Sequence, residues 1–255
     1  MSRTAPPDIA ALGERLALPP ARGRFHEPDL DGLPAPVRRH LRLAIAPGMP
    51  RARAARITMR GRLKLGSRWL PFRAREVLAP LAGFVWTARV AGVLSGSDHY
   101  VDGEGGLDWR LFGLMPVMQS SGTDVARSAA ARGGAEGIWV PTALLPRFGV
   151  GWSAEDDTHL TAGYHVDGVD LDVSYTIDRT GRLTAVTFPR WGDPDETGTW
   201  SLRPFGIDVT GYGTFGGLAV PAAGRVGWFH GTDRWDEGEF FRYRITRLDP
   251  VEHTP

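Results

Sequence analysis

Residues Val169–Asp178 read VDLDVSYTID, and this stretch decides the fold. Apolar and polar side chains alternate along it at every position: Val169, Leu171, Val173, Tyr175 and Ile177 against Asp170, Asp172, Ser174 and Thr176. Because successive side chains of a strand point to opposite faces, this period predicts a strand with one buried and one solvated face. Arg179-Thr180-Gly181 then predicts a turn, and LTAVTF (183–188) predicts the return strand of a hairpin.

The same two-residue period recurs on both sides of this hairpin. It predicts further strands at 56–65, 69–77, 84–92, 97–101, 107–114, 159–166, 199–210, 225–228 and 239–248. Short turns between strands favour antiparallel pairing, and strands do not alternate with helices as they do in a doubly wound parallel sheet. The sequence therefore predicts a mainly β (α+β) fold, built as a curved antiparallel sheet or half-barrel of about ten strands.

Helical patterns lie at the N-terminus and in the middle of the chain. Residues 7–17 and 33–45 predict two N-terminal helices, and 123–139 predicts one internal helix on the concave side of the sheet. Gly133-Gly134 weakens this helix by about 1 kcal/mol per glycine relative to alanine and predicts a kink. We expect residues 1–50 to form a helical segment packed on the sheet. Residues 51–250 should form a single β domain with its internal helix near 123–140.

The segment AEGIWVPTALLP (135–146) is expected to plug the mouth of the curved sheet. A strongly curved sheet has a concave apolar face that something must fill, and prolines stop the internal helix after Trp139. Arg132 and Glu136 are four residues apart and can pair on one helix face. If space remains inside, it is an apolar small-molecule site with few polar groups, and its predicted residues are Trp86, Arg132, Glu136, Trp139 and Leu144. The alternatives are a fully packed interior and an ion pair that only holds the helix to the sheet.

Composition and missing motifs narrow the function. The chain has no cysteine, which excludes disulfides, zinc-thiolate sites and thiol nucleophiles. The phosphate-loop, dinucleotide, metal-ligand and nucleophile-elbow motifs are absent as well, so we assign no cofactor, metal or catalytic residue. Neither a signal peptide nor an apolar run long enough for a membrane helix is present, which predicts a cytoplasmic protein.

The charges are divided unevenly between the two parts of the chain. Residues 1–75 carry 16 basic and 5 acidic side chains, and the remainder carries 14 basic and 24 acidic ones. Arg56, Arg60, Arg62 and Lys64 form a basic strip along one predicted strand, which suits peripheral contact with an anionic membrane. No aromatic side chains alternate with them, which disfavours nucleic acid. The alternative is that the basic part pairs with the acidic remainder in the folded protein.

An ordered set of short motifs resembles a known family. The set comprises Leu33-Pro-x-Pro-Val-Arg-Arg-His-Leu, Trp69-x-Pro-Phe-x-Ala, Gly83-Phe-x-Trp-x-Ala-Arg89, Asp102-Gly-x-Gly and Arg132-x-x-x-Glu136-x-x-Trp139-x-Pro141-x-Ala143-Leu-Leu-Pro146. It is similar to a family of uncharacterised bacterial proteins classified as a domain of unknown function. The likeness covers about 33–248. The strand order also resembles, more weakly, the half-barrels of lipoprotein carriers and related lipid binders.

Together these features favour a non-enzymatic binder of an apolar or amphipathic small molecule, lipid-like in character, held on the concave face. Two alternatives stay open. One is an enzyme whose catalytic pair comes from separate strands, and the other is a structural or partner-binding module. The sequence assigns neither the ligand nor the oligomeric state.

Overall fold

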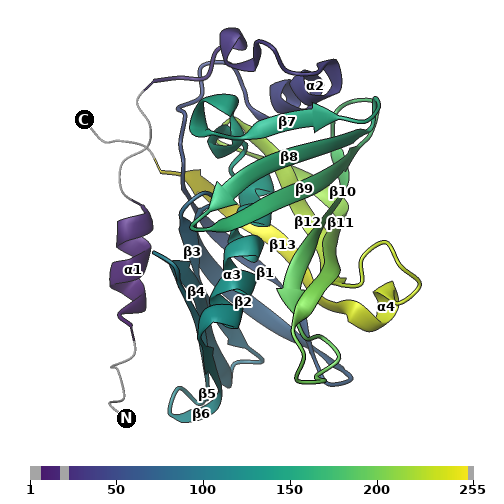
Figure 1. Ribbon diagram of the computed structural model, residues 1–255. Coiled ribbons are helices and arrows are strands. Elements are labelled where there is room, and N and C mark those ends of the chain that lie inside the picture. Colours follow the sequence, from purple (N-terminus) through teal and green to yellow (C-terminus); the bar gives the residue numbers. More distant parts are fainter. Residues whose placement is uncertain (1–6, 18–22, 252–255) are drawn as a thin grey trace.

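A computed structural model of the protein describes residues 7–17 and 23–251, and within them thirteen strands form one antiparallel sheet (Figure 1). The first wing contains β1 (Ala55–Leu65), β2 (Arg68–Ala79), β3 (Gly83–Val90), β4 (Leu94–Val101), β5 (Glu104–Leu111) and β6 (Met115–Ser121). The second contains β7 (Gly151–Ala154), β8 (His159–Val166), β9 (Val169–Ile177), β10 (Leu183–Gly192), β11 (Ser201–Phe215), β12 (Leu218–Trp228) and β13 (Glu239–Pro250). The predicted curved antiparallel sheet is confirmed.

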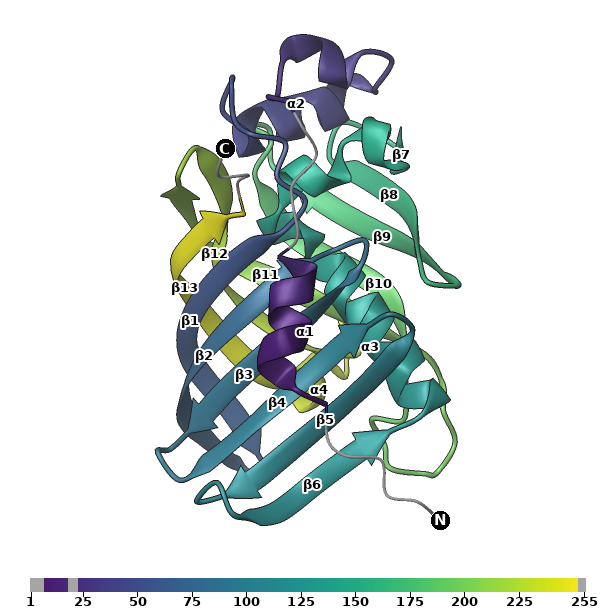
Figure 2. The same ribbon diagram turned by 90° about the vertical axis from the view of Figure 1, so that its left-hand side faces the viewer.

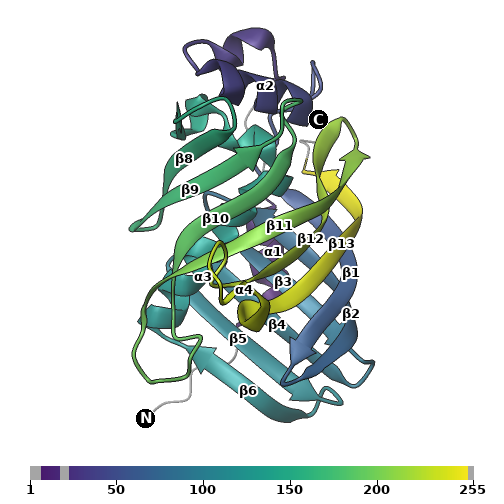
Figure 3. The ribbon, with the colours of Figure 1, turned by 90° about the vertical axis from the view of Figure 1, so that its right-hand side faces the viewer.

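The strand order is β6-β5-β4-β3-β2-β1-β13-β12-β11-β10-β9-β8-β7. The chain thus winds outward from β1 to one edge, crosses to the other edge, and winds back to β13, which pairs with β1 (Figure 3). Most connections within a wing are short turns, as the alternating pattern predicts, and longer ones join β10 to β11 and β12 to β13. The two wings curve around a common concave face that holds most of the buried apolar side chains.

The crossing segment lies inside the sheet. It consists of α3 (Thr123–Ala135) and three short 3₁₀ turns at Glu136–Trp139, Pro141–Leu144 and Pro146–Phe148. The predicted internal helix on the concave side is confirmed, and its α-helical part ends directly after the two glycines. These glycines also allow close approach to both wings. A Cβ at Gly133 would lie 2.8 Å from the Phe84 ring in β3, and one at Gly134 would lie 2.4 Å from Leu171 in β9.

Helices from the N-terminal part pack on the outside and at one end. The helix α1 (Ile9–Leu16) covers the outer face of the first wing, where Leu16 packs with Val85 and Val101 (Figure 2). After the 3₁₀ turn Glu27–Leu30, α2 (Ala35–Ala44) covers the upper end of the sheet with Val37 and Leu41 in the main core. The short α4 (Trp235–Gly238) lies between β12 and β13. Residues 1–6 and 18–22 of the predicted N-terminal segment 1–50 lie outside the described residues.

The expected number of strands was too low, and the two that the sequence did not reveal are the two edges. The strand predicted at 107–114 runs past the end of β5 at Leu111 into the turn, and no strand was predicted where β6 begins at Met115. Every residue of β6 is exposed, so its side chains show no alternation of burial. β7 has only four residues, too few to establish a period. An edge strand pairs on one side only, and its sequence is correspondingly less constrained by the core.

Candidate functional site

The structure brings three of the five predicted site residues together on the concave face. Trp86 in β3 is 3% exposed, and the Arg132 guanidinium lies 5.4 Å from its ring centroid. Arg132 Nε donates to Glu136 Oε1 at 3.0 Å, so the predicted pair forms. The same guanidinium lies 4.5 Å from the Phe84 ring centroid. An arginine stacked on two aromatic rings is held in a fixed orientation, because its planar head packs against their faces.

The other two predicted residues lie deeper in the plug. Trp139 is 2% exposed, its Nε1 donates to the Pro221 carbonyl at 3.0 Å, and its ring packs edge-on against Tyr243. Leu144 is buried against the turn at Gly137, where a Cβ would lie 2.9 Å from a Leu144 methyl group. Both residues belong to the packed interior. They anchor the crossing segment, whereas the polar group at Arg132 faces the sheet.

Arg132 also pairs with a second carboxylate, which the sequence did not link to it. Its Nη1 donates to Asp98 Oδ2 in β4 at 2.8 Å. The other Asp98 oxygen accepts from Trp109 Nε1 at 3.0 Å. Arg132 therefore joins the crossing segment to the first wing through a charge-assisted hydrogen bond as well as through aromatic packing.

A further buried carboxyl group, Glu76, completes this cluster. Glu76 in β2, Trp86 in β3 and Asp98 in β4 are directly opposite one another in the register, so their side chains share the concave face. Glu76 is 2% exposed, and neither of its carboxyl oxygens has a hydrogen-bond donor among the described residues. Burial, followed by the charge of the Glu136 carboxylate, raises the pKa of Glu76 well above its ordinary value, and Arg132 offsets this only in part. A protonated Glu76 can donate to Glu136 Oε2, which has no other partner among residues 7–17 and 23–251.

Glu76→Gln is expected to stabilise the protein by about 1–3 kcal/mol at pH 8, with a smaller gain at pH 5. A raised pKa means that folded Glu76 retains a proton that the unfolded chain releases. Glu76 therefore makes its full contribution to the stability of the wild-type protein at pH values below its pKa in the unfolded chain. This contribution is lost as the pH rises through its pKa in the folded protein. Glutamine stays neutral and its amide can still donate to Glu136. Urea midpoints at the two pH values measure the difference. Glu104→Gln, at an exposed position of β5, is the control, and a gain that is independent of pH would contradict the raised pKa.

Arg190 in β10 brings a second cation to the concave face from the other wing. Its Nε donates to Ser128 of α3, at 3.1 Å to Oγ and 3.3 Å to the carbonyl, and its head lies over the rings of Phe205 and Trp228. Burial lowers the pKa of Arg190 to about 9, and the neighbouring Arg132 acts in the same direction. The guanidinium still stays protonated at neutral pH. It makes no ion pair with any residue in 7–17 or 23–251, and only Nε is hydrogen bonded there.

The floor around the two arginines is rich in aromatic rings. Trp86 contacts Trp109, Phe72 and Phe241 with centroid separations of 5.8–6.1 Å, and Phe205 contacts Trp228 at 4.9 Å. The side chains nearer the lower end are only half-buried on this core: Leu63, Leu70, Leu94, Leu107, Trp228, Phe240 and Phe241. The interior is thus packed beneath the crossing segment, and an apolar concave surface remains partly exposed beside Arg190.

A second polar group lies on the outer face of the second wing. His230 Nδ1 lies 2.6 Å from Thr187 Oγ1, and its Nε2 lies 3.0 Å from Asp208 Oδ1. This hydroxyl–imidazole–carboxylate order resembles that of a catalytic triad. The imidazole is buried, however, with the Trp235 ring edge-on to it and its own ring against Gly206. The group fastens the connection between β12 and β13 to the sheet.

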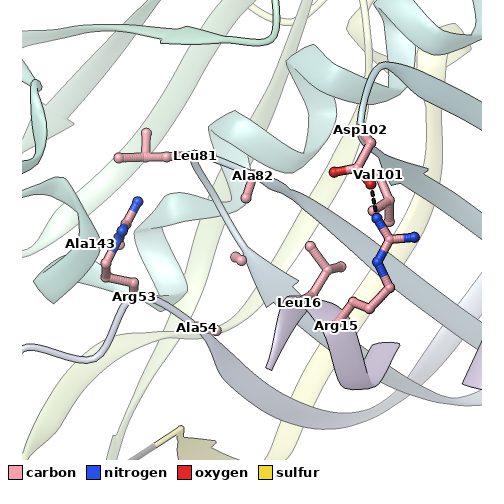
Figure 4. Close-up of a pocket in the computed structure, with 10 residues that line it drawn as sticks. Arg15, Leu16, Arg53, Ala54, Leu81, Ala82, Val101, Asp102 and Ala143 are labelled. Carbon is pink, nitrogen blue, oxygen red and sulfur yellow. Dashed lines mark hydrogen bonds and ion pairs between the residues drawn. The ribbon is translucent and has the colours of Figure 1, made fainter. Parts of the chain in front are cut away.

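A pocket of about 350 Å³ lies where α1 meets the first wing (Figure 4). Arg15 of α1 pairs with Asp102 on one side of it, and Arg53 and Leu81 line the other. None of the five predicted site residues lines this pocket, although Ala143, the neighbour of Leu144, does. It is lined by alanine and other aliphatic side chains together with Arg15, Arg53 and Asp102, and it shares no lining residue with the aromatic floor of the concave face.

Sequence reasoning missed Glu76, Asp98 and Arg190 as members of the concave group. Asp98 and its neighbour His99 are successive residues of β4 and point to opposite faces, so only Asp98 reaches the concave group. Glu76 carried a usable signal, because it occupies a position on the apolar face of its strand, between Ala74 and Leu78. Arg190 likewise follows Val186 and Phe188 on the buried face of β10. A charged residue at a strand position where the alternation predicts an apolar side chain is the signal that would have identified both Glu76 and Arg190.

Comparisons with known proteins place the chain in a family but assign no activity. The model of a family described as "Family of unknown function (DUF6544)" matches residues 23–240. The fold is similar to a DUF1329 family protein from Desulfovibrio piger, with 11% identity, a TM-score of 0.38, and 78% of this chain and 86% of that chain covered. It is also similar to a LolA superfamily protein from Nitrosomonas europaea, with 9% identity, a TM-score of 0.40, and coverage of 87% and 94%. The search of curated proteins gave no match.

Proposed function

The chain belongs to the DUF6544 family of unknown function, as the ordered motifs predicted, and from the geometry of its concave face we propose that it binds an anionic amphipathic small molecule without chemical conversion. The apolar part of the ligand lies along the half-buried aromatic floor, and its carboxylate or phosphate group contacts Arg190. The protein then acts as a carrier or reservoir for that molecule.

The unpaired cation at Arg190 is the observation that carries this proposal. Arg190 is half-buried, and its polar partners among the described residues are the hydroxyl and the carbonyl of Ser128, so no carboxylate there compensates its charge. Arg132, by contrast, forms ion pairs with both Asp98 and Glu136. The two terminal nitrogens of Arg190 are therefore free for a bidentate contact with an anionic head group, which is the geometry that guanidinium favours.

The surroundings of Arg190 suit an apolar chain. Trp228, Phe240 and Phe241 are half-buried members of the concave core, and Leu63 and Leu70 extend the same surface towards the lower end. The buried middle of α3 consists of small residues: Ser128, Ala129, Ala130 and Ala131. Each small side chain buries little apolar area, so each contact of α3 with the sheet contributes little free energy. A ligand that replaces some of these contacts therefore costs the fold little. Apolar walls with few polar groups are typical of small-molecule sites.

Native mass spectrometry and probe binding test this function. Protein purified without detergent is expected to carry an anionic, lipid-like mass, and a dansyl-labelled long-chain fatty acid is expected to gain fluorescence when it binds. Arg190→Met is expected to weaken binding of the fatty acid by about 10–100-fold, the loss of a charged hydrogen bond. Arg179→Met, at an exposed residue of the β9–β10 turn and away from the concave face, is the matched control.

The corresponding dansyl-labelled fatty alcohol separates the head group from the chain. It should bind wild-type protein and Arg190→Met alike, because it has no charge to pair. If Arg190→Met weakens binding of the acid and of the alcohol equally, Arg190 does not contact the head group, and the substitution has disturbed the aromatic floor. A wild-type protein that carries no adduct and leaves both probes dark would overturn the proposed function.

A further inference from the structure

Exposed large apolar side chains are concentrated at one end of the sheet. Among the described residues they are Leu65, Val93, Phe112, Leu114, Met115, Val117, Met118 and Leu202. Three hairpin turns supply the first five, and they lie together at the lower left of Figure 2: β1–β2, β3–β4 and β5–β6. Val117 and Met118 follow in edge strand β6, and Leu202 begins β11 beyond the β10–β11 turn. Clustering of this kind marks an interaction surface, whereas scattered apolar residues do not.

The β5–β6 turn is the clearest part of this end. Phe112 is 68% exposed and Leu114 is 78% exposed. Phe112 also has a φ of 52°, a left-handed conformation that bulky residues rarely adopt. Glycine or asparagine would suit such a turn better. A ring that is 68% exposed at an unfavourable backbone position gains little from packing within the chain, which suits a contact outside the molecule.

Arginines on the outer face form a row across four strands, and this row reaches the β3–β4 turn at Arg89. Arg244, Arg60, Arg73 and Arg89 occupy four neighbouring strands, β13, β1, β2 and β3, and each lies opposite the next in the register. Like charges directly opposite one another destabilise a sheet. Arg89 precedes the β3–β4 turn by two residues. The row continues through Ser95 to Arg110, two residues before Phe112.

This arginine row is not neutralised within the described part of the chain. Its four members Arg244, Arg60, Arg73 and Arg89 are exposed and form no ion pair there, whereas Arg56, which the sequence placed in the same basic strip, pairs with Glu14 of α1. Arg62 and Lys64 of that strip also form no ion pair within the described residues, so the unpaired cations run along β1 as well as across the neighbouring strands. The helix α1 packs on the part of the outer face around Val77 and Val85 and leaves the row uncovered.

We propose that this end of the protein docks on an anionic phospholipid bilayer, with the hairpin tips in the interface and the arginine row against the head groups. The charge pattern matches an anionic surface, to which each basic side chain contributes about 1 kcal/mol. The exposed Phe112, Leu114 and Met115 favour a bilayer over a nucleic acid, because only the bilayer offers an apolar interior. No helix in the described residues is long and apolar enough to span a membrane, and this contact needs none.

Vesicle co-sedimentation tests the docking surface. The full chain is expected to bind vesicles of phosphatidylcholine with phosphatidylglycerol, and to bind vesicles of phosphatidylcholine alone at least about tenfold more weakly. Leu114→Asp combined with Met115→Asp should weaken binding to the anionic vesicles by about tenfold or more, as should Arg89→Glu. Arg179→Glu in the β9–β10 turn, at the opposite end of the strands, is the control. Each of these three variants lowers the formal charge by the same amount, so a non-specific charge effect would appear in all of them.

The outcomes separate this surface from the concave site and from other partners. The fatty-acid probe should bind the tip variant (Leu114→Asp with Met115→Asp) and Arg89→Glu as tightly as it binds the wild type, because neither variant changes Arg190. Absence of vesicle binding by the wild type would overturn the docking proposal and leave the concave site standing. Equal losses of vesicle binding in all three variants would also overturn it. So would duplex DNA that competes fully with the anionic vesicles. A third contradicting result is a wild-type dimer in sedimentation velocity that Leu114→Asp with Met115→Asp abolishes, while no vesicle binding is seen.

Discussion

Arg132→Met is expected to destabilise the protein by about 3–5 kcal/mol, measured as the free energy of unfolding in urea at pH 7. Arg132 is the only cation that forms ion pairs with Asp98 and Glu136 among the described residues, and its side chain is 18% exposed. Methionine keeps much of the length and the apolar contact with Phe84 and Trp86 but leaves the carboxylates without their counter-charge. Removing one partner of a buried pair is far more harmful than the net contribution of the pair itself.

Two further variants test the cause of that loss. Arg127→Met lies on the same helix at an exposed position, where its head stacks on Trp191, and should reduce stability by less than about 1 kcal/mol. Arg132→Met combined with Asp98→Asn and Glu136→Gln should regain part of the lost stability, because no buried carboxylate is then left uncompensated. If the triple variant is no more stable than Arg132→Met alone, packing and not charge accounts for the effect.

Trp139→Ala is expected to destabilise the protein by about 3–5 kcal/mol as well. The indole is 2% exposed, it packs on Tyr243, and its Nε1 satisfies the buried Pro221 carbonyl, which Tyr243 Oη reaches only at 3.4 Å. The substitution removes apolar contacts, leaves a cavity at the middle of the plug and weakens the hydrogen bonding of that carbonyl. Loss of this anchor should also loosen the crossing segment over the concave face.

Trp69→Ala provides the comparison for the tryptophan. Trp69 is a half-exposed residue of β2 whose ring lies under Arg242, with 4.4 Å from the guanidinium carbon to the ring centroid. Its loss should reduce the free energy of unfolding by about 1 kcal/mol. Hydrogen exchange of the α3 amides should accelerate in Trp139→Ala and stay unchanged in Trp69→Ala. Similar unfolding midpoints for the two variants would show that Trp139 does not anchor the plug.

The period of the sequence was sufficient to predict the sheet, because each strand buries one face. Val169–Asp178 and its neighbours were placed as strands for that reason, and the helix within 123–139 was predicted from the change of period and the prolines after it. The edge strands β6 and β7 escaped notice for the opposite reason: one is exposed throughout and the other is too short to show a period. Alternation of apolar and polar residues reveals a strand only where the strand buries one face and is long enough to show the two-residue period.

The candidate site was predictable only where its partners are close in the sequence. The pairing of Arg132 with Glu136 follows from helical spacing, which is a local property of the backbone. The addition of Glu76, Asp98 and Arg190 depends on the register of strands from two wings and on the position of α3 between them, which no local pattern encodes. The arginine row is of the same kind, since residues 60 and 244 become neighbours only when β1 pairs with β13. Alternation along the chain determined which side chains face inward, and the pairing of distant strands decided which of them meet.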